Sequence, residues 1–288
     1  MNIIIVRTKK GIKYAQKIQN YILRQKVNCY VTEISELEET IKQYNLNPKN
    51  TLIHARCAGT ITNKILAQFA KQGYKIINSP ETLELTSNKY LANLHAQKNK
   101  LPIAKTYKIL KDDLDGLINL LKKHKVLVLK PIHSKGQGIF CQKVDFNCQD
   151  EELKQILNSV PGKKIQVQEF IDYKKLIRVI VIDYKALDNA YTYDVPSANW
   201  KCSVCLNPKI KKYIPNSDKL KKLAEKTARV FKAQVNFIDF FEDQKGKFIL
   251  NEINTACSLL IHEKITGVPI HCYIGDFLIK ELKNFGVN

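Results

Sequence analysis

The sequence lacks the patterns that mark membrane, secreted and zinc-stabilised proteins. No apolar run is long enough to span a bilayer, and the first residues do not have the order of a secretory signal. The single Cys-x-x-Cys pair, Cys202 and Cys205, has no second pair to complete a four-ligand zinc site. We therefore expect a cytoplasmic protein without membrane contacts, whose eight cysteines stay reduced.

Acidic residues are also scarce. The chain has 27 Asp and Glu residues against 47 Lys and Arg residues, a net charge of +20. Such an excess suggests an acidic partner: an anionic peptide or carrier, a nucleotide or nucleic acid. Because the lysines are spread widely and no RNA-binding or helix-turn-helix signature occurs, nucleic acid is not the expected main partner. An anion- or RNA-binding protein is an alternative that rests on charge alone.

A chain of 288 residues is long enough for two or three subdomains. In its first 80 residues, strand patterns alternate with helix patterns, which predicts an open parallel sheet. Ligands of such sheets bind beyond the carboxyl ends of the strands. Arg56 lies at such an end, either to bind a carboxylate or as an ordinary solvated side chain. The strands are predicted at 3–6, 28–31, 51–56 and 74–78, and the helices at 13–25 and 61–72.

The remaining chain mixes helices with strands that are not in regular alternation. A helix pattern over 81–98 contains a possible break near Ser87. Further helices are predicted over residues 112–123, 151–158, 217–232 and 273–282, and further strands over residues 126–129, 139–140, 165–171 and 177–182.

Residues 236–258 hold the most informative pattern. Two apolar runs flank a polar break that contains Gly246, which predicts a β-hairpin. Since strand side chains alternate between faces, Glu252 and Asn254 project to one side, and Asp239 on the facing strand can reach the same side. Two carboxylates and an amide are the oxygen ligands that Mg²⁺ prefers. The alternative is an edge hairpin without a metal site, whose charged side chains face water.

Two basic residues accompany apolar strands. Lys130 ends one strand and precedes a loop with Gly136 and Gly138. Glycines let a backbone approach phosphate oxygens closely, but the loop is not a Walker A motif and by itself is also compatible with a hairpin turn. Arg178 borders the apolar run at 177–182, as an anion clamp or as an arginine at a strand mouth.

Taken in order, these segments resemble the ATP-grasp superfamily, and most of all its RimK-type carboxylate–amine ligases. Each segment is short, but their order and spacing together are specific. The resemblance is carried by Asn78-Ser79-Pro80 with Lys89, by Leu101 to Thr106, by Lys130-Pro131 and the glycine loop, by Val167 to Ile171, by Ile177-Arg178, by Asp239 with Glu252-Ile253-Asn254, and by Glu263 to Val268.

This resemblance implies an ATP-grasp fold of α/β class. It implies a parallel-sheet pre-ATP-grasp domain over 1–84, a small lobe over 85–165, and an α+β large lobe with the metal site over 166–288. The implied reaction joins an amino acid to a peptide, protein or small carrier through an acyl phosphate, releasing ADP and phosphate. The net charge of +20 favours an acidic acceptor. ATP and Mg²⁺, or Mn²⁺, are the implied cofactors, and a homo-oligomer is possible.

The resemblance also implies roles for single residues. Lys89 and Lys130 would hold ATP phosphates, and Arg178 would steady the acyl phosphate, with Arg178 and Lys130 as the catalytic pair. The implied metal ligands are Asp239, Glu252 and Asn254. The remaining implied nucleotide contacts are Gln168, Glu169, Phe170, Ile171 and Lys201.

Several positions depart from the family pattern. Ser134 stands where the phosphate loop has its first glycine, and Leu176 replaces the aspartate of the family's D-I-R motif. Trp200-Lys201-Cys202-Ser203 lacks the asparagine of its F-R-x-N motif. The intact metal triad indicates retained catalysis, and the altered loop indicates an unusual substrate. The alternative is a regulatory or scaffold module that binds nucleotide without catalysis.

Overall fold

The N-terminal segment forms a parallel sheet, which confirms the fold expected there. The computed structural model describes residues 1–57, 59–132, 140–196, 200–201, 209–215 and 217–285. Strands β1 and β3 are apolar along both faces, so both faces need cover. The sheet consists, in spatial order, of β2 (Asn28–Glu33), β1 (Asn2–Arg7), β3 (Thr51–Arg56) and β4 (Lys75–Ile77).

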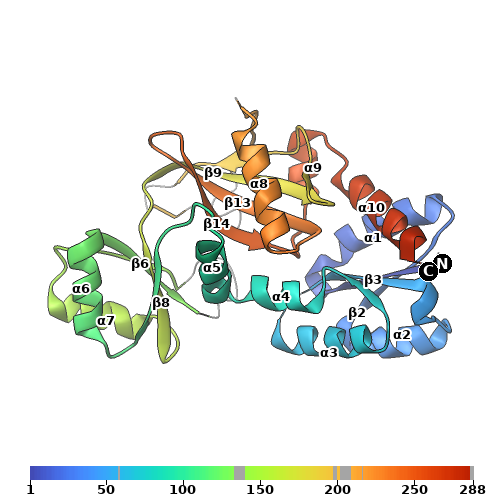
Figure 1. Cartoon of the computed structure of the whole chain (residues 1–288), viewed down its shortest axis with the longest axis horizontal. Helices are drawn as coiled ribbons and strands as arrows, with labels where there is room; N and C mark the ends of the chain where they lie inside the picture. Colours follow the sequence, from blue (N-terminus) through green and yellow to red (C-terminus); the bar gives the residue numbers. More distant parts are fainter. Residues whose placement is uncertain (58, 133–139, 197–199, 202–208, 216, 286–288) are drawn as a thin grey trace.

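Helices cover both faces of this sheet. Tyr14 and Ile18 of α1 pack on one face, and Leu66 and Phe69 of α3 belong to the core on the other. The C-terminal helix α10 returns to the first face and lies beside α1 (Figure 1). The helices concerned are α1 (Ile12–Arg24), α2 (Leu37–Gln43), α3 (Thr60–Lys71) and α10 (Ile270–Phe285).

A second sheet forms the lobe at the opposite end of the molecule (Figure 1). It is antiparallel, and α6 and α7 share its core through leucines such as Leu117 and Leu153. Asp113 caps α6 by accepting a hydrogen bond from the N–H of Gly116 at 2.9 Å. Its elements are β5 (Thr106–Leu110), β8 (Lys164–Glu169), β6 (Val126–Pro131), β7 (Gln142–Asp145), α6 (Leu114–His124) and α7 (Asp150–Ser159).

The third sheet carries the predicted hairpin and lies between the other two. All its strand pairs are antiparallel, and α8 covers one face through Leu220, Ala224 and Ala228. Its strands are β12 (Lys211–Lys212), β11 (Thr192–Asp194), β9 (Tyr173–Ile182), β13 (Val235–Asp243) and β14 (Phe248–Asn254), with β10 (Lys185–Ala186) paired to β9; its helices are α8 (Lys219–Val230) and α9 (Leu260–Thr266).

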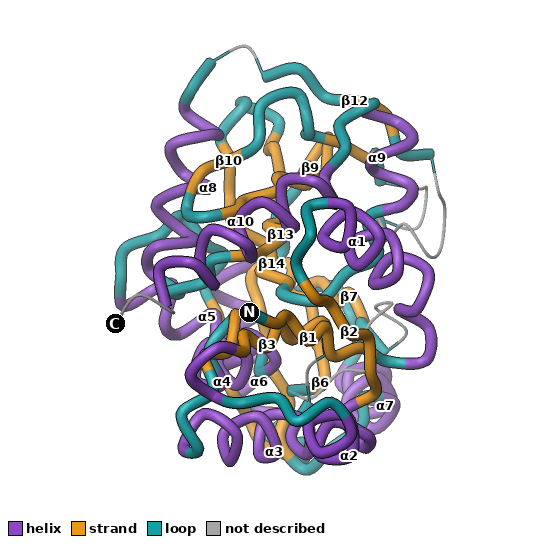
Figure 2. The backbone as a smooth tube through the Cα atoms, turned by 90° about the vertical axis from the view of Figure 1, so that its right-hand side faces the viewer, coloured by secondary structure: helices purple, strands orange, loops and turns teal. Residues whose placement is uncertain are grey.

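Two short helices, α4 (Pro80–Ser87) and α5 (Lys89–Lys98), connect the first sheet to the second (Figure 1). Before them, the buried side chain of Asn78 fixes the first sheet to the third. Its Oδ1 accepts from the N–H of Gln234 and of Val235, and its Nδ2 donates to the Val235 carbonyl. The hydrophobic core is continuous across this junction, because residues of β1, β3, β9, β13 and α10 belong to one cluster. Figure 2 shows the backbone of these elements.

Some local expectations were wrong. The strand after the glycine loop begins at Gln142, whereas the sequence suggested residues 139–140; Phe140 lies in a turn. Strand β9 begins at Tyr173, four residues earlier than expected, because Lys174 and Lys175 pair with Glu242 on β13. Helices α2 and α9 were not predicted. Among the helices that the structure describes, none is long and apolar enough to cross a bilayer.

Candidate active site

Four polar side chains form a line across one face of the third sheet. Thr192 of β11 lies opposite Arg178 of β9, Arg178 opposite Asp239 of β13, and Asp239 opposite Glu252 of β14. Directly opposed residues in a sheet share a face, so these four side chains are neighbours. We call Thr192, Arg178, Asp239 and Glu252 the polar row. Asn254, two residues beyond Glu252, lies on the same face.

Arg178 and Asp239 form a two-pronged ion pair in the middle of this row. Nε and Nη2 of Arg178 donate to the two oxygens of Asp239, each at 2.7 Å. Burial raises the pKa of the Asp239 carboxyl, which is 3% exposed, and the guanidinium opposes that rise. Burial would lower the pKa of Arg178, but the Asp239 carboxylate outweighs it and raises that pKa. Arg178 is therefore not at a strand mouth: it lies within β9 and is permanently charged.

Glu252 is neutralised by a lysine from another part of the chain. Its Oε2 accepts from Nζ of Lys89 at 2.8 Å, and its Oε1 accepts from Nδ2 of Asn254 at 3.0 Å. Burial would raise the pKa of Glu252, but Lys89 and these hydrogen bonds lower it to about 2. Asn254 Nδ2 is also 3.5 Å from Oδ2 of Asp239. The structure thus brings the three predicted metal ligands together.

The break between α4 and α5 places Lys89. Asn88 leaves the helical conformation and caps α5, with its Oδ1 accepting from the N–H of Leu91 at 3.1 Å. Lys89 is then the first residue of α5 and its side chain reaches β14. The connecting segment runs along the same strand, because the Leu250 N–H donates to the Pro102 carbonyl.

His262 of α9 contacts two residues of the polar row. It was not identified from the sequence. Its Nε2 lies 3.5 Å from Nη1 of Arg178, and its Nδ1 lies 2.9 Å from Oγ1 of Thr192. Since arginine can only donate, Nε2 accepts and Nδ1–H donates to the threonine. Burial and the charge of Arg178 lower the pKa of His262 to about 3, so the ring is neutral. An isolated histidine in a seven-residue helix gives no periodic signal that could have identified it.

Lys130 lies on the neighbouring sheet and faces the same region. Its Nζ donates to Oε1 of Gln168 at 2.7 Å, and Nε2 of Gln168 donates to Oγ1 of Thr106. Burial lowers the pKa of Lys130, and the charges of Lys89 and Glu252 also act on it. Lys89 on α5 and Lys130 on β6 therefore both experience the charge of Glu252, and Lys89 is in direct contact with it.

Two backbone N–H groups at the end of β8 and just after it already make hydrogen bonds. The N–H of Glu169 donates to the Lys105 carbonyl, and the N–H of Phe170 donates to the Val126 carbonyl. We call the segment from Gln168 to Ile171 the hinge. An adenine would have to form hydrogen bonds with other backbone groups of the hinge. The Phe170 ring lies 6.1 Å from the Trp200 ring, edge to face. Nζ of Lys201 lies 5.5 Å from the centre of the Trp200 ring, so Lys201 also borders the hinge.

The chemistry of the donor set fits a hard cation. Asp239, Glu252 and Asn254 offer carboxylate and amide oxygens, and Mg²⁺ is commonly held by one or two carboxylates together with substrate phosphates. Within the described ranges, no group of three or more His, Cys, Asp or Glu side chains gathers into a metal site of its own. Because Mg²⁺ usually completes its ligands with substrate phosphates, the donor set suits a metal that arrives with a phosphate ligand. The glycine loop at 133–139 and the Cys202–Cys205 pair fall outside the described residues.

Comparisons with known proteins find similar sequences and similar folds. A family model described as a RimK-like ATP-grasp domain matches residues 85–278. Among curated proteins, the tetrahydromethanopterin:alpha-L-glutamate ligase of Methanocaldococcus jannaschii is 28% identical, over 73% of this chain and 72% of its own. The coenzyme gamma-F420-2:alpha-L-glutamate ligase of Methanococcus maripaludis is 26% identical, over 83% of this chain and 86% of its own.

Solved structures share the fold at low sequence identity. The ATP-grasp ligase PsnB, complexed with a phosphomimetic variant of its minimal precursor, Mg and ADP, has a TM-score of 0.74 at 14% identity, covering 97% of this chain and 98% of its own. The macrocyclase MdnC, bound with the precursor peptide MdnA from Microcystis aeruginosa, has a TM-score of 0.73 at 12% identity, covering 98% of this chain and 100% of its own.

Proposed function

The chain belongs to the RimK-like ATP-grasp family and is an ATP-grasp ligase, and from this premise we propose that it joins an amino acid to a peptide, protein or small carrier. The reaction proceeds through an acyl phosphate: a substrate carboxylate attacks the γ-phosphate of ATP, the P–O bond to ADP breaks, and an amine then displaces phosphate from the acyl carbon. The products are the amide, ADP and inorganic phosphate.

The observation that carries this proposal is the arrangement of charges around the polar row. Attack of a carboxylate on a triphosphate brings anions together, so cations must neutralise the charge as it is redistributed. Arg178 and Lys89 meet at the polar row from a strand and a helix, and Lys130 faces the same region. The side chains are positioned on regular elements, which favours catalysis by orientation and electrostatics over a protein nucleophile.

Asp239, Glu252 and Asn254 are the residues that would hold Mg²⁺. When bound, the metal would neutralise phosphate oxygens and polarise the transferred phosphoryl group. Both carboxylates are engaged by Arg178 and Lys89 in this structure. Ligand binding would therefore exchange partners: the carboxylates would turn to the cation, and the two basic side chains to phosphate and acyl oxygens. Neutral His262 would keep the Arg178 guanidinium in the plane of the row.

Lys89 and Lys130 would bind the phosphates, and the hinge from Gln168 to Ile171 would bind the adenine. Lys201, stacked on Trp200 beside that hinge, is placed to reach the nucleotide from the loop side. The net charge of +20 favours an acceptor that is itself acidic, such as a glutamate-rich peptide or an anionic carrier.

The test is a measurement of ADP release from ATP and Mg²⁺, with pooled L-amino acids offered together with acidic peptides. We expect ADP and phosphate to appear only when both substrate types are present. With both substrates labelled with oxygen-18 in their carboxylates, one label should appear in the released phosphate for each amide formed, because the attacking oxygen stays with phosphorus. Formation of AMP and pyrophosphate, or unlabelled phosphate, would contradict the acyl-phosphate route.

A further inference from the structure

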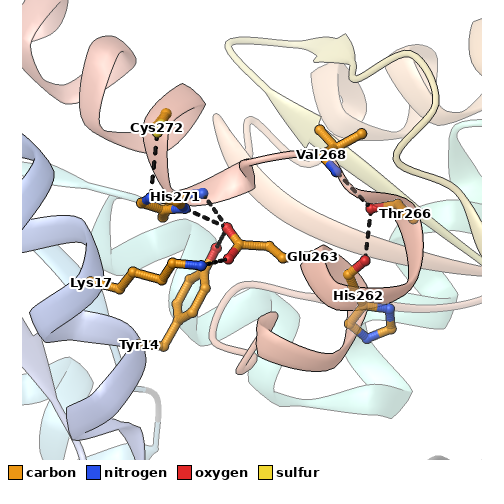
Figure 3. A network of polar contacts seen from close by, with 8 residues as sticks. All are labelled: Tyr14, Lys17, His262, Glu263, Thr266, Val268, His271 and Cys272. Atoms are coloured by element: carbon orange, nitrogen blue, oxygen red, sulfur yellow. Dashed lines mark hydrogen bonds and ion pairs between the residues drawn. The ribbon is translucent and has the colours of Figure 1, made fainter.

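A cysteine, a histidine and a glutamate form a hydrogen-bonded chain at the start of α10 (Figure 3). Sγ of Cys272 lies 3.4 Å from Nε2 of His271, and Nδ1 of His271 lies 2.8 Å from Oε1 of Glu263. Glu263 belongs to α9, whereas the other two residues are consecutive on α10. A nucleophile, a base and a third group that orients the base are the parts of an activated thiol. None of the three residues belongs to the polar row.

The Glu263 carboxylate sets the tautomer of the imidazole ring. Burial would raise the pKa of Glu263, but Lys17 and His271 lower it, so this carboxyl is ionised at neutral pH. Since a carboxylate can only accept, Nδ1 of His271 carries a proton and donates it to Oε1. The N–H of His271 donates to the same oxygen at 2.7 Å. Nε2 of the neutral ring is therefore an acceptor, and the S–H of Cys272 donates to it.

Cys272 depends on this base for its reactivity. The residue is partly exposed, which leaves it accessible to a small reagent. Burial and the charges of Asp276 and Glu263 raise the pKa of its thiol. Because the thiolate is the nucleophile, the proton must first leave the sulfur at neutral pH. His271 can take it, and the imidazolium then lies between the thiolate and the Glu263 carboxylate.

The backbone around Cys272 decides which electrophile suits the thiol. The N–H groups of Ile270 and Cys272 donate to backbone carbonyls at 2.9 Å each, and that of His271 donates to Glu263. These three groups therefore cannot form an oxyanion hole, which acyl transfer needs. Exchange with a disulfide needs no such donors, because the charge stays on the sulfur atoms.

Within the described ranges, no other cysteine makes a hydrogen bond to a histidine. Cys148 is partly exposed as well, so it offers a comparison thiol in the same molecule. Cys29 is buried and should react only if the chain unfolds.

We propose that Cys272 is a base-activated thiol that exchanges with small disulfides. The proton passes from Sγ to Nε2 of His271, and the thiolate attacks one sulfur of the disulfide. A new S–S bond forms at Cys272, the S–S bond of the reagent breaks, and the departing thiolate takes the proton from Nε2. The protein thiol is oxidised and half of the disulfide is reduced, so no further oxidant takes part. The product is a mixed disulfide, which a second thiol can reverse.

The test follows the reaction of the full chain with oxidised glutathione, and mass spectrometry of its peptides gives the rate at each cysteine. At pH 7 we expect Cys272 to react at least about 10-fold faster than Cys148, since a positioned base accelerates proton removal. Cys29 should stay unmodified in every sample, which shows that the fold is intact.

His271→Asn removes the base but keeps an amide N–H donor for Glu263. It should slow the reaction of Cys272 at least about 10-fold and leave that of Cys148 unchanged. His95→Asn is the matched control: it removes another partly buried histidine, whose ring nitrogen is hydrogen-bonded to a backbone carbonyl. The Cys272 rate should not change in this variant.

The pH profile separates base catalysis from a structural role. Moving a proton from Sγ to Nε2 leaves the number of protons on the pair unchanged, so the rate at Cys272 should change less than about 3-fold between pH 8 and pH 7. An ordinary thiol with a pKa of about 8.5 slows about 8-fold over the same interval, and we expect this of Cys148 and of Cys272 in His271→Asn. The charged and titratable groups around the pair belong to residue types whose ordinary pKa values lie outside this interval: Tyr14, Lys17, Tyr21 and Arg24 of α1, Glu263 of α9 and Asp276 of α10.

Equal rates at Cys272 and Cys148 would overturn the proposal. So would a His271→Asn variant that reacts as fast as the wild type, or a wild-type Cys272 rate that falls with pH as an ordinary thiol does. If Cys29 became modified in His271→Asn, the variant would have unfolded, and the wild-type rate ratio and pH profile would decide the matter without it.

Discussion

Asp239→Asn is expected to slow ADP release by at least about 10²–10³-fold, the usual cost of removing one electrostatic contact to a transition state. The amide has nearly the same shape but cannot neutralise Arg178 or offer an anionic oxygen to a cation. Asp239 lies between Arg178 and Asn254. Glu252 is the next residue of the polar row, so Glu252→Gln should slow ADP release by a comparable factor. Both rates are measured at saturating ATP and Mg²⁺.

Glu242→Gln is the matched control for both variants. Glu242 lies on the same strand as Asp239, is also buried and is also ion-paired, with Lys174 and Lys175, but it is outside the polar row. Its rate should stay within a factor of about two, because Glu242 makes its ion pairs with the partly exposed Lys174 and Lys175 and not with the polar row. Circular dichroism should show an intact fold in all three variants. Full ADP release by Asp239→Asn or Glu252→Gln would contradict the assignment of Asp239 and Glu252 as metal ligands.

Glu263→Gln is expected to have the largest effect on stability. The Glu263 carboxylate accepts from the Tyr14 hydroxyl, from Lys17, and from both the N–H and Nδ1 of His271, so it fastens α9 to α1 and α10 (Figure 3). Removing its charge should cost about 2–4 kcal/mol, less than for a fully buried pair because Lys17 is 40% exposed. The melting temperature should fall by about 3–7 °C.

The pH dependence of this loss follows from the pKa of Glu263. Burial would raise that pKa, but Lys17 and His271 lower it below the ordinary 4.5. The unfolded chain therefore takes up the proton first, so the stabilisation is fully present above about pH 4.5 and is lost as the pH falls through the lower folded-state pKa. The difference in melting temperature between wild type and Glu263→Gln should be constant from pH 7 to pH 5 and shrink below pH 4.5.

Glu281→Gln provides the comparison for Glu263. Glu281 lies on α10 and makes a single ion pair with Lys75, both side chains being partly exposed. Its replacement should cost less than about 1 kcal/mol. Equal losses for the two variants, or a Glu263→Gln deficit that persists unchanged at pH 4, would show that the Glu263 charge does not fasten these helices.

The elements that the sequence predicted well are those with a strong local signal. The unbroken apolar strands β1 and β3 and the hairpin around Gly246 have such a signal, and all three are present. Helix α2 has only Leu37 buried among seven residues, so it shows no apolar periodicity. Helix α9 was likewise too short, although Gly267, in a left-handed conformation with φ of 74°, is a stop signal that could have revealed its end.

The parts of the site that the sequence did not predict depend on contacts between residues far apart in the chain. The hairpin pattern was enough to place Asp239, Glu252 and Asn254 together, because their relation is local. The contacts of Glu252 with Lys89 and of Arg178 with His262 join residues far apart in the chain, so no spacing rule encodes them. The burial of Arg56 depends on Tyr14 and on the segment at Cys257, which only the folded chain brings together.

The central claim is that this chain binds ATP through a metal held at the polar row, and titration with a non-hydrolysable ATP analogue, with and without Mg²⁺, tests it most directly. Heat of binding can be followed together with the fluorescence of Trp200, the only tryptophan, whose ring lies beside Phe170 at the hinge. We predict binding that requires Mg²⁺ and weakens at least about 10-fold, or 1.4 kcal/mol, in Asp239→Asn. Absence of binding under both conditions, or Mg²⁺-independent binding that Asp239→Asn leaves unchanged, would contradict it.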